Sequence, residues 1–162
     1  MGLSSQIAIF PGTFDPFTNG HLDITRRASR LFGRVIVAVA QNPQKAELNN
    51  HSARASVIRQ CVADMPNVTV ESFCGLTVDF CRKVGSGVLL RGIRNSSDLQ
   101  AEIQMAMTNR TVAGVETVFL LTSPEHAFLS SSLIRQIASM GGDVSAMVPP
   151  AVLESLSNGK KP

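Results

Sequence analysis

Short apolar runs alternate with amphipathic segments along almost the whole chain. Five runs are rich in β-branched residues and apolar on both faces, as expected for parallel strands covered on both sides of a sheet. They occupy residues 7–10, 35–40, 68–73, 88–90 and 115–121. Helical spacing predicts helices at 21–32, 52–64, 76–84, 98–113 and 131–139, with a short last helix after Pro149-Pro150. This alternation favours an α/β fold with a doubly wound, five-stranded parallel sheet.

The pattern also predicts roles for single residues and for the chain as a whole. Asp98 is the expected N-cap of the fourth helix, ahead of apolar residues at helical spacing. Leu31 and Phe32 are expected on the apolar face of the first helix. The length is that of one ordinary domain, so residues 1–162 are expected to form one, with 158–162 as a frayed tail.

Composition indicates a folded protein with a modest positive charge. Hydrophobic residues make up 44% of the 162 residues and charged residues 17%, which argues against disorder. The formal net charge is +3, and most of the fifteen cationic residues are arginine, whose planar fork grips phosphate at two points. A small-molecule phosphate site, a nucleic-acid surface and a solvated basic face are all compatible with this balance. Trp and Tyr are absent, which leaves little for the stacking platforms of single-strand binders.

The cysteines and the apolar runs bear on location. Cys61, Cys74 and Cys81 form no C-x-x-C pair, so they indicate neither a disulfide framework nor a zinc site, and reduced thiols in the cytoplasm are expected. The first residues lack the pattern of a signal peptide. No apolar stretch approaches the ~18 residues that a membrane helix needs, so no membrane partner is expected.

The loop after the first strand carries the first candidate chemistry. It contains Gly12 and Gly20, which permit close backbone approach, and it runs directly into a helix start at His21. The free N–H groups and the positive dipole end of such a start bind anions, and His21 could donate hydrogen bonds to phosphate oxygens. The loop is neither a P-loop nor a G-x-G-x-x-G fingerprint. By itself, a Gly-His pair is more often a turn with a capping histidine.

Three other strand ends add cations and hydroxyls. Arg91 and Arg94 follow the fourth strand, Lys45 follows the second, and the serines 130–132 open a helix after the fifth. Each feature alone is weak evidence for a phosphate site, since the serines could simply cap a helix and the arginines could lie on the surface. The carboxyl ends of strands in a doubly wound sheet meet at one edge. One cleft therefore collects these groups with Thr13 and His21, and a site for several phosphates is expected there.

The same residues form motifs that resemble a known family. Thr18-Asn19-Gly20-His21 resembles the (T/H)-x-G-H signature of the nucleotidyltransferases, and residues 130–135 resemble their serine-rich second motif. More specifically, bacterial phosphopantetheine adenylyltransferases are resembled by the segments 11–16, 18–24, 90–94, 109–110 and 141–144, together with Asp98, Glu102 and Gln104. The resemblance covers about residues 6 to 157 in the expected order, and it implies a Rossmann-like nucleotidyltransferase fold.

The resemblance implies a reaction and its partners. The reaction is adenylyl transfer from ATP to 4′-phosphopantetheine, which gives dephospho-coenzyme A and pyrophosphate in the penultimate step of coenzyme A biosynthesis. Mg²⁺ is implied as the cofactor. The sequence shows no paired-carboxylate motif for a metal held by the protein, so the ion is expected to be held mainly through the substrate phosphates, with no metal ligands on the protein. A homohexamer with coenzyme A as feedback inhibitor, located in the cytoplasm, is also implied.

The resemblance also implies which residues act. His21 would stabilise the transition state. The residues implied to bind phosphopantetheine are Thr13, Lys45, Thr77 and Arg91. Those implied to bind ATP are Thr13, Phe14, His21, Gly92, Ile93, Arg94, Glu102, His126, Ala127, Phe128, Leu129, Ser130, Ser131 and Ser132.

Two departures and two alternatives accompany this reading. Ala101 stands before Glu102, where the family usually has an aromatic residue, and the start of the second helix keeps Arg54 but lacks the family's acidic residue. The first alternative is a nucleotidyltransferase for another acceptor, such as nicotinate mononucleotide, glycerol phosphate or phosphocholine. The second is a non-catalytic basic domain that binds nucleic acid or a dinucleotide. The chain has no run of basic residues interleaved with aromatic ones, so no nucleic-acid partner is expected.

Overall fold

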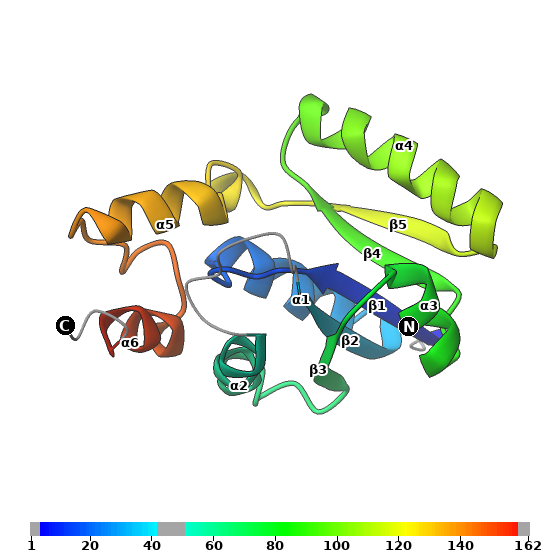
Figure 1. The fold of residues 1–162 in the computed structure, drawn as a ribbon, viewed down its shortest axis with the longest axis horizontal. Helices are drawn as coiled ribbons and strands as arrows, with labels where there is room; N and C mark the ends of the chain where they lie inside the picture. Colours follow the sequence, from blue (N-terminus) through cyan, green and yellow to red (C-terminus); the bar gives the residue numbers. More distant parts are fainter. Residues whose placement is uncertain (1–3, 42–50, 159–162) are drawn as a thin grey trace.

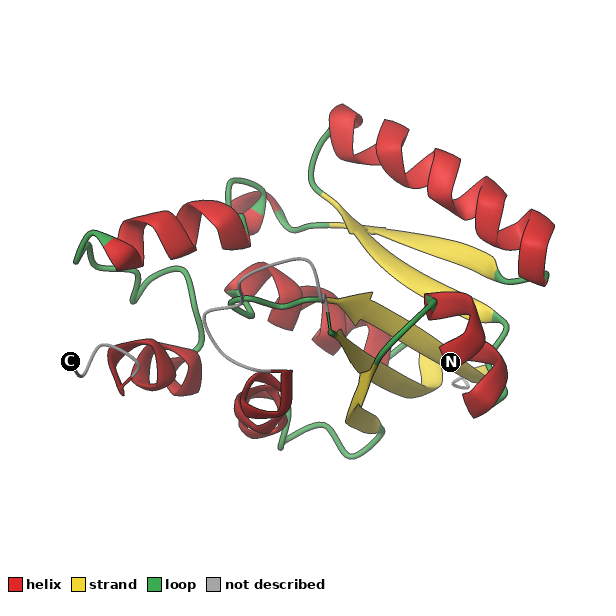
Figure 2. Cartoon of the chain, viewed as in Figure 1, coloured by secondary structure: helices red, strands yellow, loops and turns green. Residues whose placement is uncertain are grey.

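A computed structural model describes residues 4–41 and 51–158 (Figures 1 and 2). Its strands are β1 (Ser4–Gly12), β2 (Phe32–Ala40), β3 (Val68–Phe73), β4 (Val88–Ile93) and β5 (Glu116–Leu121). Its α-helices are α1 (Asn19–Ser29), α2 (His51–Cys61), α3 (Thr77–Val84), α4 (Ser96–Ala113), α5 (Ser131–Ser139) and α6 (Pro150–Asn158), with a 3₁₀ turn η1 (Pro124–His126) before α5. The strands form one sheet in the order β3-β2-β1-β4-β5, and all pairs are parallel. The predicted α/β fold with a five-stranded parallel sheet is confirmed.

The three central strands, β2, β1 and β4, are largely buried on both faces, as their apolar runs predicted. The same expectation is wrong for β5, which has no buried residue, and β3 exposes Ser72. On one face Val35, Val37 and Leu90 pack with residues of α1, α2, α5 and α6. On the other face Ile36 and Leu89 pack with residues of α3 and with Val115. Successive residues of a strand point to opposite faces, so strands that serve two cores must be apolar at every position. Figure 1 shows α4 running beside β4 and β5, with α5 and α6 beyond the end of the strands.

The sheet opens between its two central strands. β1 pairs with β4 only at Ala8–Val88 and Ile9–Leu89. By contrast, β1 follows β2 as far as Gly12, and β4 follows β5 as far as Ile93. The two strands therefore part toward their carboxyl ends, at the point where the strand order reverses. This is the crevice in which doubly wound sheets bind ligands.

Two helix ends differ from the prediction. The prediction of Asp98 as an N-cap is wrong, because α4 begins two residues earlier and Asn95 Oδ1 accepts the Asp98 N–H at 2.9 Å. The Asp98 carboxylate instead binds Arg94. The first helix ends at Ser29, so Leu31 is 50% exposed and Phe32 starts β2 as a buried residue.

The predicted tail lies almost wholly outside the described residues, since only Asn158 is described and it ends α6. All three cysteines are unpaired. Burial raises the pKa of the Cys61 thiol to about 11 and also raises that of Cys81. Both thiols are therefore protonated near neutral pH. Among the helices in the described residues, none has the length and apolar character needed to cross a bilayer.

Candidate active site

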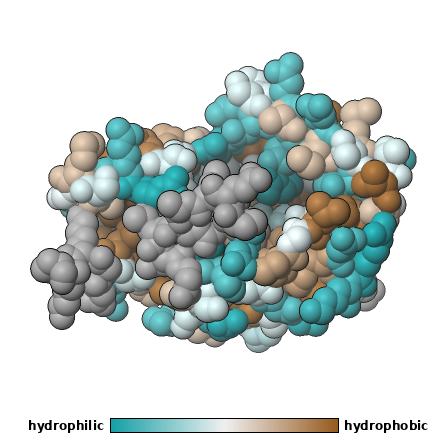
Figure 3. All heavy atoms as spheres, viewed as in Figure 1, coloured by the Kyte–Doolittle hydropathy of each residue, from teal (hydrophilic) through white to brown (hydrophobic). Residues whose placement is uncertain are grey.

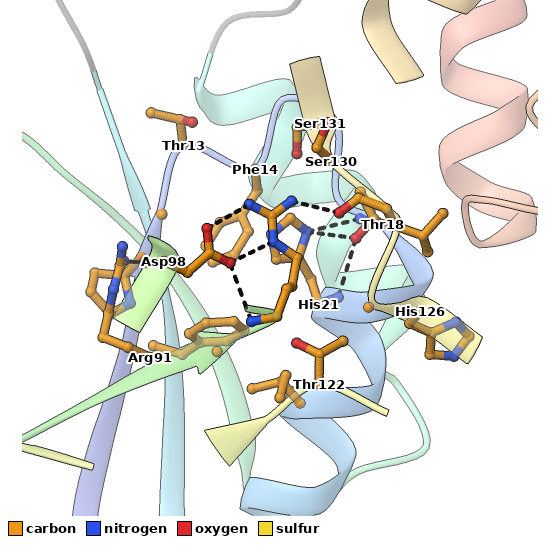
Figure 4. A pocket seen from close by; sticks show the side chains of 18 of the residues that line it. Thr13, Phe14, Thr18, His21, Arg91, Asp98, Thr122, His126, Ser130 and Ser131 are labelled. Carbon is orange, nitrogen blue, oxygen red and sulfur yellow. Dashed lines mark hydrogen bonds and ion pairs between the residues drawn. The ribbon is translucent and has the colours of Figure 1, made fainter. Parts of the chain in front are cut away.

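A cavity of about 350 Å³ lies in the crevice beyond β1 and β4 (Figure 4). Its walls come from the loops after β1, β4 and β5 and from the first turns of α1, α4 and α5. The predicted site residues that line it are Thr13, Phe14, His21, Arg91, Gly92, Arg94, Glu102, His126, Leu129, Ser130, Ser131 and Ser132. The structure thus gathers residues from three strand ends into one space, whose volume is in the range of small-molecule sites.

Four predicted residues do not line this cavity, and a fifth falls outside the described residues. Ile93 is buried, Phe128 is 62% exposed, and neither they nor Ala127 line this cavity. Thr77 lines a neighbouring cavity instead. Lys45 falls in residues 42–50, outside the described part of the chain.

The neighbouring cavity, of about 360 Å³, continues the first one. The two share Pro11, Arg91 and Glu102 in their walls. Thr77 and Asn109 supply polar groups to the second cavity, and its other side chains are mostly apolar. A pair of ligands, one in each cavity, would therefore meet at Arg91. This suits a reaction that joins two substrates, because the reacting groups are brought together at the shared wall.

His21 is held in one tautomer by the start of α1. The Thr18 hydroxyl accepts the His21 N–H at 3.2 Å, and the Thr18 N–H donates to His21 Nδ1 at 3.0 Å (Figure 4). This reciprocal pair is a capping box in which histidine takes the usual place of Glu or Gln. Because Nδ1 accepts a hydrogen bond, the ring proton is on Nε2. His21 is therefore both a capping residue and a hydrogen-bond donor in the cavity wall.

The surroundings keep His21 neutral. Its ring stacks on Phe17 with centroids 5.5 Å apart and meets the edge of Phe14 at 5.1 Å. Burial, followed by the positive charges of Arg94 and Arg91, lowers the pKa of His21 from 6.5 to about 4. At pH 7 the imidazole is thus an uncharged donor, which can stabilise a developing negative charge without a change of protonation.

The low pKa of His21 predicts a pH dependence of stability. The unfolded chain takes up this proton near pH 6.5 and the folded chain only near pH 4, so acid favours the unfolded state in that window. The stabilisation is complete above pH 6.5 and is lost as the pH falls toward 4, by up to about 2 kcal/mol at pH 5. Urea unfolding of the wild type and of His21→Gln at pH 7.5 and pH 5 measures it. The wild type should lose more stability than the variant, and equal losses would contradict a depressed pKa.

Arg91 stands at the wall shared by the two cavities. Its Nε donates to Glu102 Oε2 at 2.8 Å, its Nη2 donates to Glu102 Oε1, and its Nη1 donates to the Pro11 carbonyl at 2.9 Å. The guanidinium is thereby locked between β4, α4 and the end of β1. A guanidinium held in this way can bind an anion without the entropy cost of ordering its side chain.

Arg94 forms the second arginine–carboxylate pair. Asp98 accepts from Arg94 Nε at 2.8 Å and from Nη2 at 3.1 Å, and Arg94 Nη1 donates to the Leu129 carbonyl at 2.8 Å. These hydrogen bonds hold the pKa of Asp98 below its usual range. Sequence reasoning missed Asp98 as a cavity residue, because an acid at a helix start is equally typical of a cap. Its spacing of four residues from Arg94 was the available signal.

The loop after β1 fits closely around Phe14. Phe14 has a positive φ of 48°, and a Cβ added at Gly12 would lie 2.9 Å from its ring. Gly12 therefore leaves room for the ring that packs against His21. Thr18 and Thr122 also line the cavity and were not predicted. Thr122 directly follows β5, so the rule that ligands bind at strand ends could have found it.

The start of α5 forms the third wall. The Ser130 hydroxyl caps the helix by accepting the Leu133 N–H at 3.2 Å, and the Ser131 hydroxyl donates to the Pro16 carbonyl at 2.8 Å. The first N–H groups of a helix have no partner within it, so this wall offers backbone donors and the positive end of the helix dipole. The predicted phosphate cradle is thus also the N-cap that the serine run suggested.

Known proteins share this fold and much of this sequence. Residues 9–137 match the family described as cytidylyltransferase-like. A phosphopantetheine adenylyltransferase of Gloeobacter violaceus is 55% identical over 152 residues, covering 93% of this chain and 94% of the relative. One from Synechocystis sp. is 52% identical over 152 residues, covering 93% and 96%. The chain belongs to the phosphopantetheine adenylyltransferase family.

A solved structure of another protein has the same fold as this member of the phosphopantetheine adenylyltransferase family. A Vibrio parahaemolyticus protein named as a nicotinate-nucleotide adenylyltransferase superposes with a TM-score of 0.70. The match covers 95% of this chain and 99% of that one at 19% identity, so it shows the shared fold alone. The family resemblance that the sequence motifs indicated is confirmed by the relatives above.

The cavity fits a magnesium ion carried by phosphates better than one held by side chains. Its two carboxylates, Asp98 and Glu102, are each bound to an arginine. Among the described residues, no group of three His, Cys, Asp or Glu side chains could hold a metal ion. Mg²⁺ keeps several waters and commonly binds through substrate phosphates.

Proposed function

We infer that this chain is a pantetheine-phosphate adenylyltransferase, which transfers the adenylyl group of ATP to 4′-phosphopantetheine and releases pyrophosphate as dephospho-coenzyme A forms. Relatives about half identical over nearly the whole chain carry this name. The observation that supports it most is the pair of cavities joined at Arg91. The cavity with His21, Arg94 and the α5 start suits a triphosphate, and the cavity with Thr77 suits the long acceptor.

The reaction needs charge stabilisation rather than a base. The attacking group is a phosphate oxygen of 4′-phosphopantetheine, which is already an anion. It forms a bond to the α-phosphorus of ATP as the bond from that phosphorus to the pyrophosphate oxygen breaks. Neutral His21 donates from Nε2 to the α-phosphate, where negative charge grows. Arg91 and Arg94 hold the two anions in place, so the reaction gains from proximity as well.

Mg²⁺ is proposed as the cofactor. The arginines of the described cavity wall are matched one to one by carboxylates, so the wall itself carries little excess positive charge. When bound, the ion would neutralise the leaving pyrophosphate. Arg91, Arg94 and the start of α5 would orient the phosphates that carry it, and no side chain of the described residues needs to act as its main ligand.

A homohexamer in the cytoplasm, inhibited by coenzyme A, completes the proposal. α4 has no buried residue, and its exposed apolar side chains include Ile103, Met107 and Val112. Figure 3 shows hydrophobic and hydrophilic residues mixed over this region. A long helix with so much exposed apolar surface favours contact with another copy.

Coenzyme A contains the pantetheine arm of the acceptor and so suits the same cavity. The unpaired cysteines agree with a reducing compartment.

Pyrophosphate release tests the function. Purified protein with ATP and Mg²⁺ should release pyrophosphate only when 4′-phosphopantetheine is added, and dephospho-coenzyme A should appear in equal amount. Nicotinate mononucleotide serves as a parallel acceptor, and a preparation of His21→Ala controls for contaminating enzymes. Release with nicotinate mononucleotide alone would overturn the acceptor, and release with neither would overturn the adenylyltransferase activity.

A further inference from the structure

A buried group of charges lies beneath the loop after β1, outside the cavity walls described above. Asp15 is 5% exposed and Arg54 is 4% exposed, whereas the Arg135 side chain is 34% exposed. Asp15 Oδ2 lies 3.1 Å from Arg135 Nη1 and 3.9 Å from Arg54 Nη1. Burying charges is expensive, so a carboxylate shared by two guanidiniums needs a reason beyond stability.

The three charges come from three different parts of the chain. Asp15 directly follows Thr13 and Phe14, which line the ATP cavity. Arg54 belongs to α2, and Arg135 belongs to α5. Arg135 is four residues beyond Ser131 and so lies on the same face of α5. Since Ser131 donates to the Pro16 carbonyl at 2.8 Å, α5 is tied twice to the same loop.

α5 needs directional contacts of this kind. It lies beyond the end of the sheet (Figure 1), and only Ile134 and Ala138 among its residues are buried. Apolar packing is not directional. These two residues therefore fix how far α5 lies from the rest of the protein better than they fix its rotation about its own axis or its position along that axis. An ion pair with hydrogen-bond geometry does restrict both. The start of α5 carries Ser130–Ser132, so its placement decides where the phosphate donors point.

We propose that Asp15 is a positioning residue for the nucleotide, which acts through Arg135 to hold the start of α5 against the loop of Thr13 and Phe14. Arg54 adds a second cation to the carboxylate and joins α2 to the same point. The proposal rests on the proposed adenylyl transfer only for the identity of the nucleotide. It assigns to Asp15, Arg54 and Arg135 a part in ATP binding although none of them lines the ATP cavity.

The test compares the two substrates. Arg135→Met removes the guanidinium and keeps an apolar stem, and the KM for ATP should rise about tenfold, the size of one charge-assisted hydrogen bond, with a fall in kcat. The KM for 4′-phosphopantetheine should change less than twofold, because Thr77 and Arg91 are untouched. Arg135→Lys should recover part of the loss, since it restores charge without the fork. Calorimetry with a non-hydrolysable ATP analogue should show the same weakening with no acceptor present.

Controls separate positioning from simple loss of stability. Arg26→Met, on α1, removes a surface ion pair with Asp64 and should leave both KM values unchanged. Asp15→Asn should raise the KM for ATP as Arg135→Met does. The double variant should have a KM for ATP no higher than that of Arg135→Met alone. A lower melting temperature with both KM values unchanged would overturn the proposal, as would equal increases of the two.

The positioning role can be tested even if the protein does not catalyse adenylyl transfer. If the wild type binds the ATP analogue but releases no pyrophosphate, the proposed function fails, and the affinity of Arg135→Met still decides the positioning role. If Asp15→Asn does not fold, the partly exposed Arg135 carries the test through its Met and Lys variants. Unchanged analogue affinity in folded Arg135→Met would overturn the proposal.

Discussion

His21→Ala is expected to lower kcat at least ~100-fold while the protein stays folded. The expected loss is the size of one donor removed from a group on which negative charge develops. His21 fits that role because its Nδ1 is occupied by the Thr18 N–H and its pKa is about 4, so Nε2 carries a proton at neutral pH without positive charge. Steady-state kinetics with each substrate varied in turn at a saturating level of the other measure the loss, and the KM values should change far less than kcat.

A matched variant separates catalysis from capping. His21→Ala also leaves the Thr18 N–H without its acceptor, which costs about 1 kcal/mol of helix stability. Gln is the usual partner in a capping box, so His21→Gln should restore the cap and the melting temperature. Its amide nitrogen cannot stand where Nε2 stands while its oxygen caps Thr18, so kcat should stay low. Turnover near the wild-type value in either folded variant would exclude His21 as the transition-state donor.

The strands and their carboxyl edge were predictable for a physical reason. A strand that packs against helices on both faces has no polar position, and the runs around Val35 and Leu89 show that pattern. Once the strands are parallel, the residues after them must meet at one edge. Arg91, His21 and Ser131 could therefore be grouped from sequence although the chain separates them widely.

Pairings between distant side chains were not predictable in this way. Asp15 and Arg135 are 120 residues apart, and no periodicity connects them. Asp98 pairs with Arg94 instead of capping α4 because the helix begins at Ser96, where Asn95 supplies the cap. Thr77 could be assigned to a binding site by resemblance. The structure places Thr77 in a second cavity that shares Arg91 with the first, which the sequence could not show.

Arg91→Met is expected to lower kcat/KM for 4′-phosphopantetheine by about 100-fold, at the upper end of the loss of a charge-assisted, two-point contact. Arg91 lines both cavities, so its guanidinium is the group that an acceptor phosphate would meet beside the nucleotide. Arg91→Lys should recover little, because an ammonium cannot reach Glu102 and the Pro11 carbonyl together as the fork does. Initial rates with the acceptor varied at saturating ATP measure the effect.

The variant has a second consequence that must be separated from the first. Arg91→Met leaves the Glu102 carboxylate, 18% exposed, without the guanidinium that neutralises it, and the unpaired charge would destabilise the fold and repel both substrates. Glu102→Gln removes that charge, so the double variant Arg91→Met/Glu102→Gln should regain the melting temperature of the wild type. Its kcat/KM should nevertheless stay low, because the acceptor phosphate still lacks its cation. Recovery of activity together with stability would mean that Arg91 serves only to balance Glu102, and the assignment of Arg91 to the acceptor would fail.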